Sequence, residues 1–76
     1  MIQFYSIALS GIETYDKIEL SNSKDDNAWF LSGVKTYHVA LKEDVSIQYT
    51  IAVSDNKEEL IVWADMNNIK IEKIET

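Results

Sequence analysis

The chain has 76 residues and carries thirteen acidic residues against seven lysines, with no arginine, proline or cysteine, for a formal net charge of −6. This length allows a single domain, residues 1–76, and the lack of cysteine excludes disulfides and thiolate metal sites, so packing alone must hold the fold. Direct nucleic-acid binding is not expected, because it normally needs a basic stripe and arginines that grip phosphate.

The first nine residues are apolar, but they carry no basic residue and are too short for a signal sequence with its cleavage site. No run approaches the roughly 18 apolar residues of a membrane span. We therefore expect no membrane association and a cytoplasmic location, which is the host cytoplasm if the protein is encoded by a phage.

The N-terminal third predicts a β-hairpin. Residues 2–9 resemble a strand with a bulge, because the apolar phase shifts between Phe4 and Tyr5. Ser10 and Gly11 form the turn, and residues 15–20 alternate and return antiparallel. Residues 21–27 form a polar segment rich in turn-forming residues.

Residues 28–31 allow two interpretations. Ser23 with Asp26 imitates a capping box and Gly33 stands where a helix often ends, which favours a helix. Four consecutive apolar residues would point all round such a helix and leave an aromatic ring in water. The strand is therefore the favoured interpretation, and the helix stays open.

The remainder predicts a four-stranded meander of residues 36–42, 46–53, 59–66 and 69–75, with turns at 43–45, 55–58 and Asn67-Asn68. Alternation places thirteen apolar residues on one face: Tyr37, Val39, Leu41, Ile47, Tyr49, Ile51, Val53, Leu60, Val62, Ala64, Met66, Ile69 and Ile71. Only residues 2–31 can cover that face. The predicted fold is all-β, a small rolled barrel or two-layer sandwich of six to seven short antiparallel strands, with 69–75 as a charged edge strand.

A helix over residues 55–67 is the main alternative, because Asp55 with Glu58 is a second capping-box match. The run Leu-Ile-Val-Trp at 60–63 favours a strand. If both ambiguous segments were helical, the chain would form two βαβ repeats, a ferredoxin-like α+β fold.

Catalytic chemistry is not expected. The single histidine, His38, has no cysteine or recognisable serine motif to activate, and the acidic doublets at 25–26, 43–44 and 58–59 fit no calcium-loop spacing. With only two glycines there is no phosphate-binding loop. The sequence predicts a protein that is not an enzyme and holds no metal or cofactor.

Trp63 indicates an interaction surface. In the predicted meander it lies on the face away from the core, and its neighbours there are Thr50, Ile61, Ala52 and Ile74. An exposed apolar patch containing a tryptophan is typical of protein interfaces, so the patch predicts a protein partner or a homodimer that lays like patch on like patch. The alternative is that Trp63 belongs to the core.

A short acidic chain without arginine, cysteine or catalytic residues is similar in composition to small phage or bacterial proteins that occupy another protein's surface, including anti-CRISPR and DNA-mimicking inhibitors. The predicted function is non-enzymatic inhibition of a basic or nucleic-acid-binding protein. The acidic contact surface would comprise Asp25, Asp26, Asp55, Glu58 and Glu59.

Two other functions stay open. One is a small-ligand-binding β-barrel whose pocket is lined by the four tyrosines, Tyr5, Tyr15, Tyr37 and Tyr49. The other is a structural or oligomerisation module.

Overall fold

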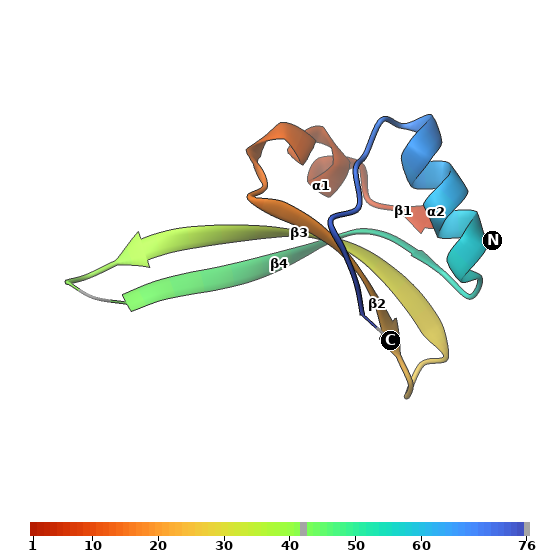
Figure 1. Cartoon of the computed structure of the whole chain (residues 1–76), viewed down its shortest axis with the longest axis horizontal. Coiled ribbons are helices and arrows are strands. Elements are labelled where there is room, and N and C mark those ends of the chain that lie inside the picture. The colour runs from red at the N-terminus through yellow and green to blue at the C-terminus, as the bar shows by residue number, and fades with distance from the viewer. Residues whose placement is uncertain (42, 76) are drawn as a thin grey trace.

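A computed structural model describes residues 1–41 and 43–75 and is mostly β, with 49% strand and 24% helix (Figure 1). In chain order the elements are β1 (Gln3–Phe4), α1 (Ser6–Ser10), the 3₁₀ turn η1 (Ile12–Thr14), β2 (Lys17–Ser23), β3 (Ala28–Val39), β4 (Glu43–Ser54), α2 (Lys57–Met66) and β5 (Lys73–Glu75).

These strands form one five-stranded sheet in the order β1-β4-β3-β2-β5. The central strands β2, β3 and β4 are antiparallel neighbours, β1 is antiparallel to β4 at one edge, and β5 is parallel to β2 at the other edge. The prediction of a mainly β fold is confirmed, whereas the predicted edge strand 69–75 is a strand only over Lys73–Glu75 and pairs with β2. The barrel or sandwich of six to seven antiparallel strands is wrong, because one open mixed sheet of five strands forms instead.

The hydrophobic core lies between this sheet and α2, which packs over one end of it (Figure 1). Leu20 and Leu31 from neighbouring strands and Leu60 from α2 are fully buried there. A β-bulge adds to this core: Leu31 pairs with Ala52 and Ser32 pairs with Thr50, so Ile51 is the extra residue of β4. Because of the bulge, Ile51 and Ala52 are both fully buried although they are adjacent.

The strand predicted at 59–66 is wrong, and the helical alternative over 55–67 is confirmed as α2. The side chain of Asn56 caps the helix by accepting the Glu59 backbone N–H at 3.2 Å. Asn68 takes a left-handed φ of 58° after the last turn. Helical spacing brings Leu60 and Ala64 onto one buried face, and this packing outweighs the strand propensity of the segment.

The predicted N-terminal hairpin is also wrong. Only Gln3 and Phe4 form a strand, which pairs with β4, and the chain then turns into α1. Residues 28–31 are a strand, as the favoured interpretation stated, and they continue through Gly33 to Val39. Since that segment is not helical, the chain does not form the two βαβ repeats of a ferredoxin-like fold.

The β3–β4 hairpin has a different register from the predicted one. Residues 43–45, the predicted turn, belong to β4, so that Tyr37 pairs with Val45 and Val39 pairs with Glu43. Ala40, with φ 51°, begins the connection; Lys42, the predicted last residue of strand 36–42, lies outside the described residues.

The outer half of this hairpin projects from the molecule as a two-stranded ribbon (Figure 1). The pairing of β2 with β3 stops at Val34, and β1 pairs with β4 only at Ala52 and Val53. We call residues 35–41 and 43–48 the arm. The radius of gyration of 12.9 Å exceeds the value of about 11 Å expected of a compact chain of this length, which reflects this projection.

Candidate interaction surface

One face of the arm is apolar. Successive side chains of a strand point to opposite faces, so the register places three cross-strand pairs on the same face: Lys35 with Ile47, Tyr37 with Val45 and Val39 with Glu43. The contacts agree, because the Tyr37 and Tyr49 hydroxyls lie 3.3 Å apart and the Lys35 Nζ lies 5.4 Å from the centre of the Tyr37 ring. We call this set, with Tyr49 at its base, the apolar face of the arm.

The opposite face of the arm is polar. Thr36 Oγ1 and Ser46 Oγ lie 3.2 Å apart across the strands, and the His38 Nδ1 contacts the carboxylate of Asp44. The arm is therefore an amphipathic ribbon.

The apolar face has no cover within the described residues. Val39, Val45 and Ile47 are 50%, 42% and 41% exposed, and Leu41 at the tip is fully exposed. The prediction that Tyr37, Val39, Leu41 and Ile47 belong to the core is wrong, because residues 2–31 form β1, α1, η1, β2 and the start of β3 and do not extend over the arm. A contiguous exposed apolar surface of this kind usually marks a contact with another molecule.

An open groove of about 840 Å³ lies at the base of the arm, beside α1. Its lining includes all four tyrosines, Tyr5, Tyr15, Tyr37 and Tyr49. The predicted grouping of these side chains is confirmed, although they line an open groove and not the interior of a barrel. Tyr37 and Tyr49 belong to both the groove and the apolar face, so the two surfaces are continuous.

Tyr15 forms the inner wall of the groove. Its hydroxyl donates to the Ala8 carbonyl at 2.8 Å, and its ring lies 5.7 Å from that of Tyr49, centre to centre. The ring packs over Gly33, where a Cβ atom would stand 2.3 Å from it, so this position requires glycine.

Two tyrosines of the groove, Tyr15 and Tyr49, have raised pKa values. Burial raises the pKa of Tyr15 above its ordinary value of 10.0, and proximity to Tyr49 adds to this. The hydrogen bond with Tyr37 raises the pKa of Tyr49, with desolvation as the next cause. At neutral pH these groups are hydrogen-bonding hydroxyls and not nucleophiles.

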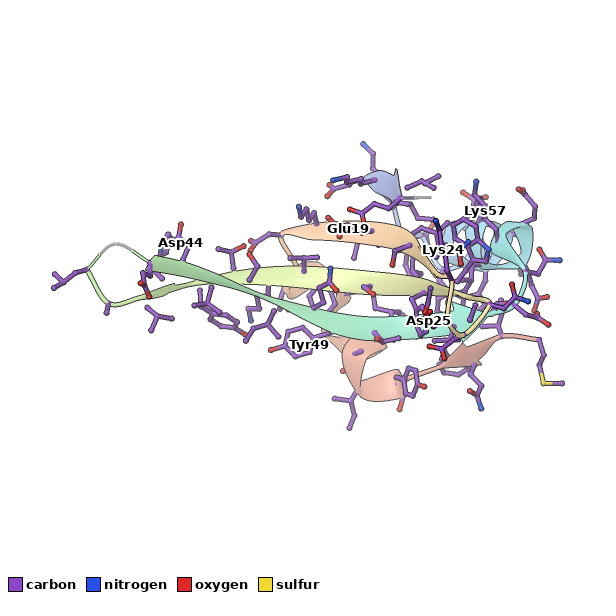
Figure 2. All side chains as sticks on the ribbon, turned by 90° about the horizontal axis from the view of Figure 1, so that it is seen from below. Glu19, Lys24, Asp25, Asp44, Tyr49 and Lys57 are labelled. Atoms are coloured by element: carbon purple, nitrogen blue, oxygen red, sulfur yellow. The ribbon has the colours of Figure 1, made fainter. Side chains whose placement is uncertain are left out.

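The predicted acidic residues lie at the end of the sheet opposite the arm tip. Trp29 near the start of β3 pairs with Ser54 at the end of β4, which brings the 24–27 turn close to the start of α2. In Figure 2, Asp25 and Lys57 accordingly lie at one end and Asp44 at the other. The acidic surface predicted from the sequence is thus gathered on one end of the molecule: Asp25, Asp26, Asp55, Glu58 and Glu59.

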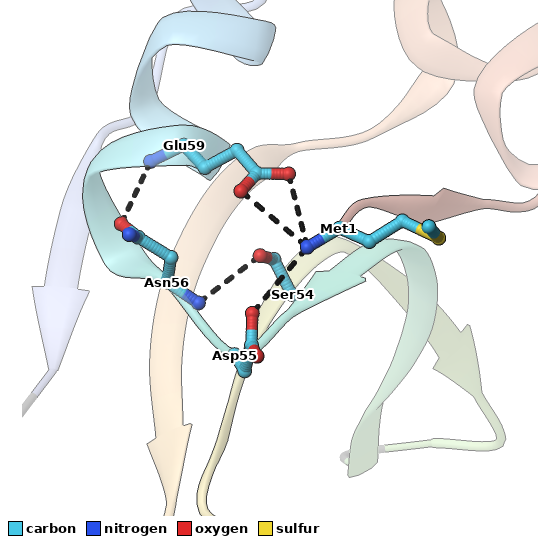
Figure 3. A network of polar contacts seen from close by, with 5 residues as sticks. All are labelled: Met1, Ser54, Asp55, Asn56 and Glu59. Atoms are coloured by element: carbon cyan, nitrogen blue, oxygen red, sulfur yellow. Dashed lines mark hydrogen bonds and ion pairs between the residues drawn. The ribbon is translucent and has the colours of Figure 1, made fainter.

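Part of that acidic set is engaged within the chain (Figure 3). The Met1 ammonium lies 3.5 Å from Asp55 Oδ1 and 3.3 Å from Glu59 Oε1, and Ser23 donates to Asp26 at 3.3 Å. Contact with the Glu59 carboxylate, the largest cause, raises the pKa of this ammonium above 8.0.

The predicted patch around Trp63 is not assembled as expected, because it depended on a strand at 59–66. Ala52 is fully buried, Thr50 lines the tyrosine groove, and Ile74 is on β5 beside Leu20. Trp63 and Ile61 are half-buried on α2, where they pack against the core.

Trp63 still borders a smaller apolar surface. Its ring stacks on Phe4 with 5.9 Å between centres, and Val62 and Met66 beside it on α2 are 57% and 77% exposed. Binding at this surface stays a prediction.

Among residues 1–41 and 43–75, no group of three or more histidine, aspartate and glutamate side chains is placed to hold a metal ion. The described part of the chain also contains no helix that is both long and apolar enough to cross a membrane.

The comparisons with known proteins give no relative. No protein-family model matches the chain, and no curated protein and no solved structure gives a significant match.

Proposed function

We propose that this chain is a non-enzymatic binding protein that acts by protein–protein association through the apolar face of the arm. The observation that carries the proposal is a projecting ribbon with one polar and one apolar face, whose apolar side chains are exposed. Isolated two-stranded ribbons are marginal in water, and burial of their apolar face against a partner stabilises them.

The positions of the titratable side chains favour association over catalysis. His38, the one imidazole, is engaged with Asp44 on the polar face, away from the tyrosine groove. In the groove itself the pKa values of Tyr15 and Tyr49 are raised, so these two phenols are protonated at neutral pH. Neither surface brings a nucleophile to a general base.

A partner other than a second copy would be basic under this proposal. The net charge of −6 favours steering of a cationic protein, and five of the acidic residues lie at the end of the molecule opposite the arm tip. Inhibition of a nucleic-acid-binding protein of phage or bacterial origin, and a cytoplasmic location, rest on composition and stay predictions.

Site-specific photo-crosslinking in cells tests the proposal. A photoreactive benzoyl-phenylalanine is placed at Tyr37 on the apolar face or at Thr36 on the polar face of the same strand. We expect covalent protein adducts from position 37 and few from position 36. Absence of adducts at both positions, or equal adducts at both, would contradict association through this face.

A second candidate function is binding of a small aromatic or apolar ligand, which the tyrosine groove supports. Its volume of about 840 Å³ lies within the range of roughly 300–1,000 Å³ that is typical of ligand sites. Thermal unfolding in the presence of a library of aromatic metabolites tests it. We expect a stabilising ligand to lose its effect in Tyr15→Ala and to keep it in Tyr5→Phe; a library that moves no midpoint counts against this function.

A further inference from the structure

We infer that the partner of the arm is a second copy of this chain, packed arm on arm about a two-fold axis, with the tip of each arm seated over the tyrosine groove of the other. This inference rests on the proposed function and names the partner. Four features carry it: the symmetry of the apolar face, its two charges, the length of the arm and the position of the groove.

The apolar face is self-complementary in shape. Its central pair is Tyr37 with Val45, flanked by Lys35 with Ile47 on the base side and Val39 with Glu43 on the tip side. A two-fold axis that runs across the strands through the central pair stacks the two arms face to face and antiparallel. Tyr37 and Val45 then each meet their own symmetry mates.

The two charges on this face are placed to pair between copies. Lys35 lies one row toward the base from the central pair and Glu43 lies one row toward the tip. The axis therefore brings Lys35 of one copy level with Glu43 of the other, displaced sideways by one strand spacing of about 4.8 Å. Both side chains are long enough to meet across that distance, and the contact occurs twice in each dimer.

The arm has the length needed for its tip to reach the groove. Rows on one face of a strand are about 6.8 Å apart, so the residues at the tip stand about 10 Å from the central pair. Tyr49, in the groove wall, stands two rows from the central pair on the base side. In the antiparallel dimer the tip of one copy, with the fully exposed Leu41, thus lies between the levels of Lys35 and Tyr49 of the other, and both of these residues line the groove.

The expected dimer is weak. The apolar face is about 25 Å long and roughly 10 Å wide, an area of about 250 Å². A standard interface takes roughly 800 Å² of accessible surface from each partner, which is much more. Seating the tip in the groove enlarges the contact without reaching that size. We therefore expect dissociation constants in the micromolar range or weaker, and the measurement must extend to high protein concentration.

Charge reversal with purified protein tests the arrangement. We expect sedimentation equilibrium to show a dimer for the wild type and dimerisation weakened about tenfold in Lys35→Glu and in Glu43→Lys, because each variant puts like charges together twice. An equimolar mixture of the two variants pairs glutamate with lysine at both contacts. The mixture should therefore dimerise like the wild type when neither variant does so alone.

Matched controls separate contact from net charge. Lys24→Glu and Asp25→Lys change the net charge by the same amounts but lie in the turn at the far end of the molecule, so both should dimerise like the wild type. On the arm itself, Val45→Asp should abolish the dimer, whereas Ser46→Asp on the polar face should leave it nearly unchanged.

The outcomes distinguish this inference from the proposed function. A wild type that stays monomeric at millimolar concentration overturns the dimer, and so does a dimer that the charge variants leave unaffected. In either case, photo-crosslinked adducts from position 37 with a different protein would still support association through the arm. Adducts of twice the mass of the chain would support the dimer and also the proposed association through the arm.

Discussion

The two ends of strands β3 and β4 show the same alternation of side chains with opposite results. Near the bulge, Leu31 pairs with Ala52 and both are fully buried, whereas in the arm Tyr37 pairs with Val45 and both are exposed. The strands are continuous between these two pairs. Alternation therefore decides which residues share a face, but whether that face is buried depends on what the rest of the chain places over it.

The helices and terminal strands that the structure describes cover only one end of this sheet. Besides the three central strands, the described chain offers α1, α2 and short terminal strands, and of these α2 packs over the far end of the sheet. Among residues 1–41 and 43–75 no other helix or strand lies over the arm. The core end therefore holds the fold, whereas the apolar face of the arm stays exposed.

The largest expected effect comes from truncating one apolar residue in the core and one in the arm. Leu31→Ala in the core should lower the free energy of unfolding by about 2–5 kcal/mol. Val45→Ala in the arm should lower it by less than about 0.5 kcal/mol, as is usual for exposed positions. Urea denaturation at low micromolar protein, where the monomer predominates, measures both, and similar losses would mean that the arm is part of the folding core.

A smaller effect is expected at the boundary between the two regions. Gly33→Ala drives a Cβ into the Tyr15 ring and should cost about 1–3 kcal/mol. Gly11→Ala is the matched control, because its added Cβ would have only ordinary contacts of 3.5 Å or more and its φ of −92° suits alanine. Thermal denaturation compares them, and an unchanged midpoint for Gly33→Ala would show that Tyr15 moves aside freely.

The attachment of the covering helix gives a third test. Asn56→Ala removes the acceptor for the Glu59 N–H and should cost about 1 kcal/mol. Asn22→Ala, at an exposed position on β2, is the control. Guanidinium denaturation followed by the fluorescence of the tryptophans, one of which lies on α2, should separate the two variants. Equal midpoints would mean that the Asn56 cap contributes nothing to the stability of α2 on the sheet.

The sequence predicted most of the strands and little of their arrangement. Segments 17–20, 36–39 and 46–53 are strands in which apolar and polar residues alternate, and 28–31, which is apolar throughout, is also a strand. The order of the sheet could not be obtained this way, since it depends on long-range pairing of β1 with β4 and of β5 with β2.

The helix α2 shows why one turn signal misled the prediction. Asparagine readily adopts positive φ, which both a tight hairpin turn and the end of a helix require. The signal at Asn67-Asn68 was therefore correct as a chain reversal, and Asn68 has the positive φ. Which of the two structures forms is decided by the burial of Leu60 and Ala64, a tertiary effect that local sequence does not contain.

The candidate surfaces divide in the same way. The grouping of the four tyrosines was predicted, although inside a barrel, whereas the apolar residues of the arm were assigned to the core. One signal could have revealed their exposure: only seven residues of 2–31 were available as the layer opposite the thirteen predicted face residues, namely Phe4, Ile7, Leu9, Ile18, Leu20, Trp29 and Leu31. The residues predicted around Trp63 do not lie together, because their placement depended on a strand at 59–66 that is a helix.

The smallest expected effect concerns Tyr49, at the junction of the two regions. Its pKa is raised chiefly by the hydrogen bond with the Tyr37 hydroxyl, so Tyr37→Phe should lower that pKa toward 10.0. Tyr5→Phe, which leaves this bond in place, is the control. Carbon NMR of the labelled Tyr49 ring during alkaline titration measures both variants. A group whose pKa is raised by folding contributes stability that is fully present below its unfolded value of 10.0 and lost as the pH rises through the raised value. The wild type should therefore lose this contribution to stability in alkali, and Tyr37→Phe should lose less. If Tyr37→Phe left the Tyr49 titration unchanged, the two hydroxyls would not be bonded, and the base of the apolar face would be less ordered than the core.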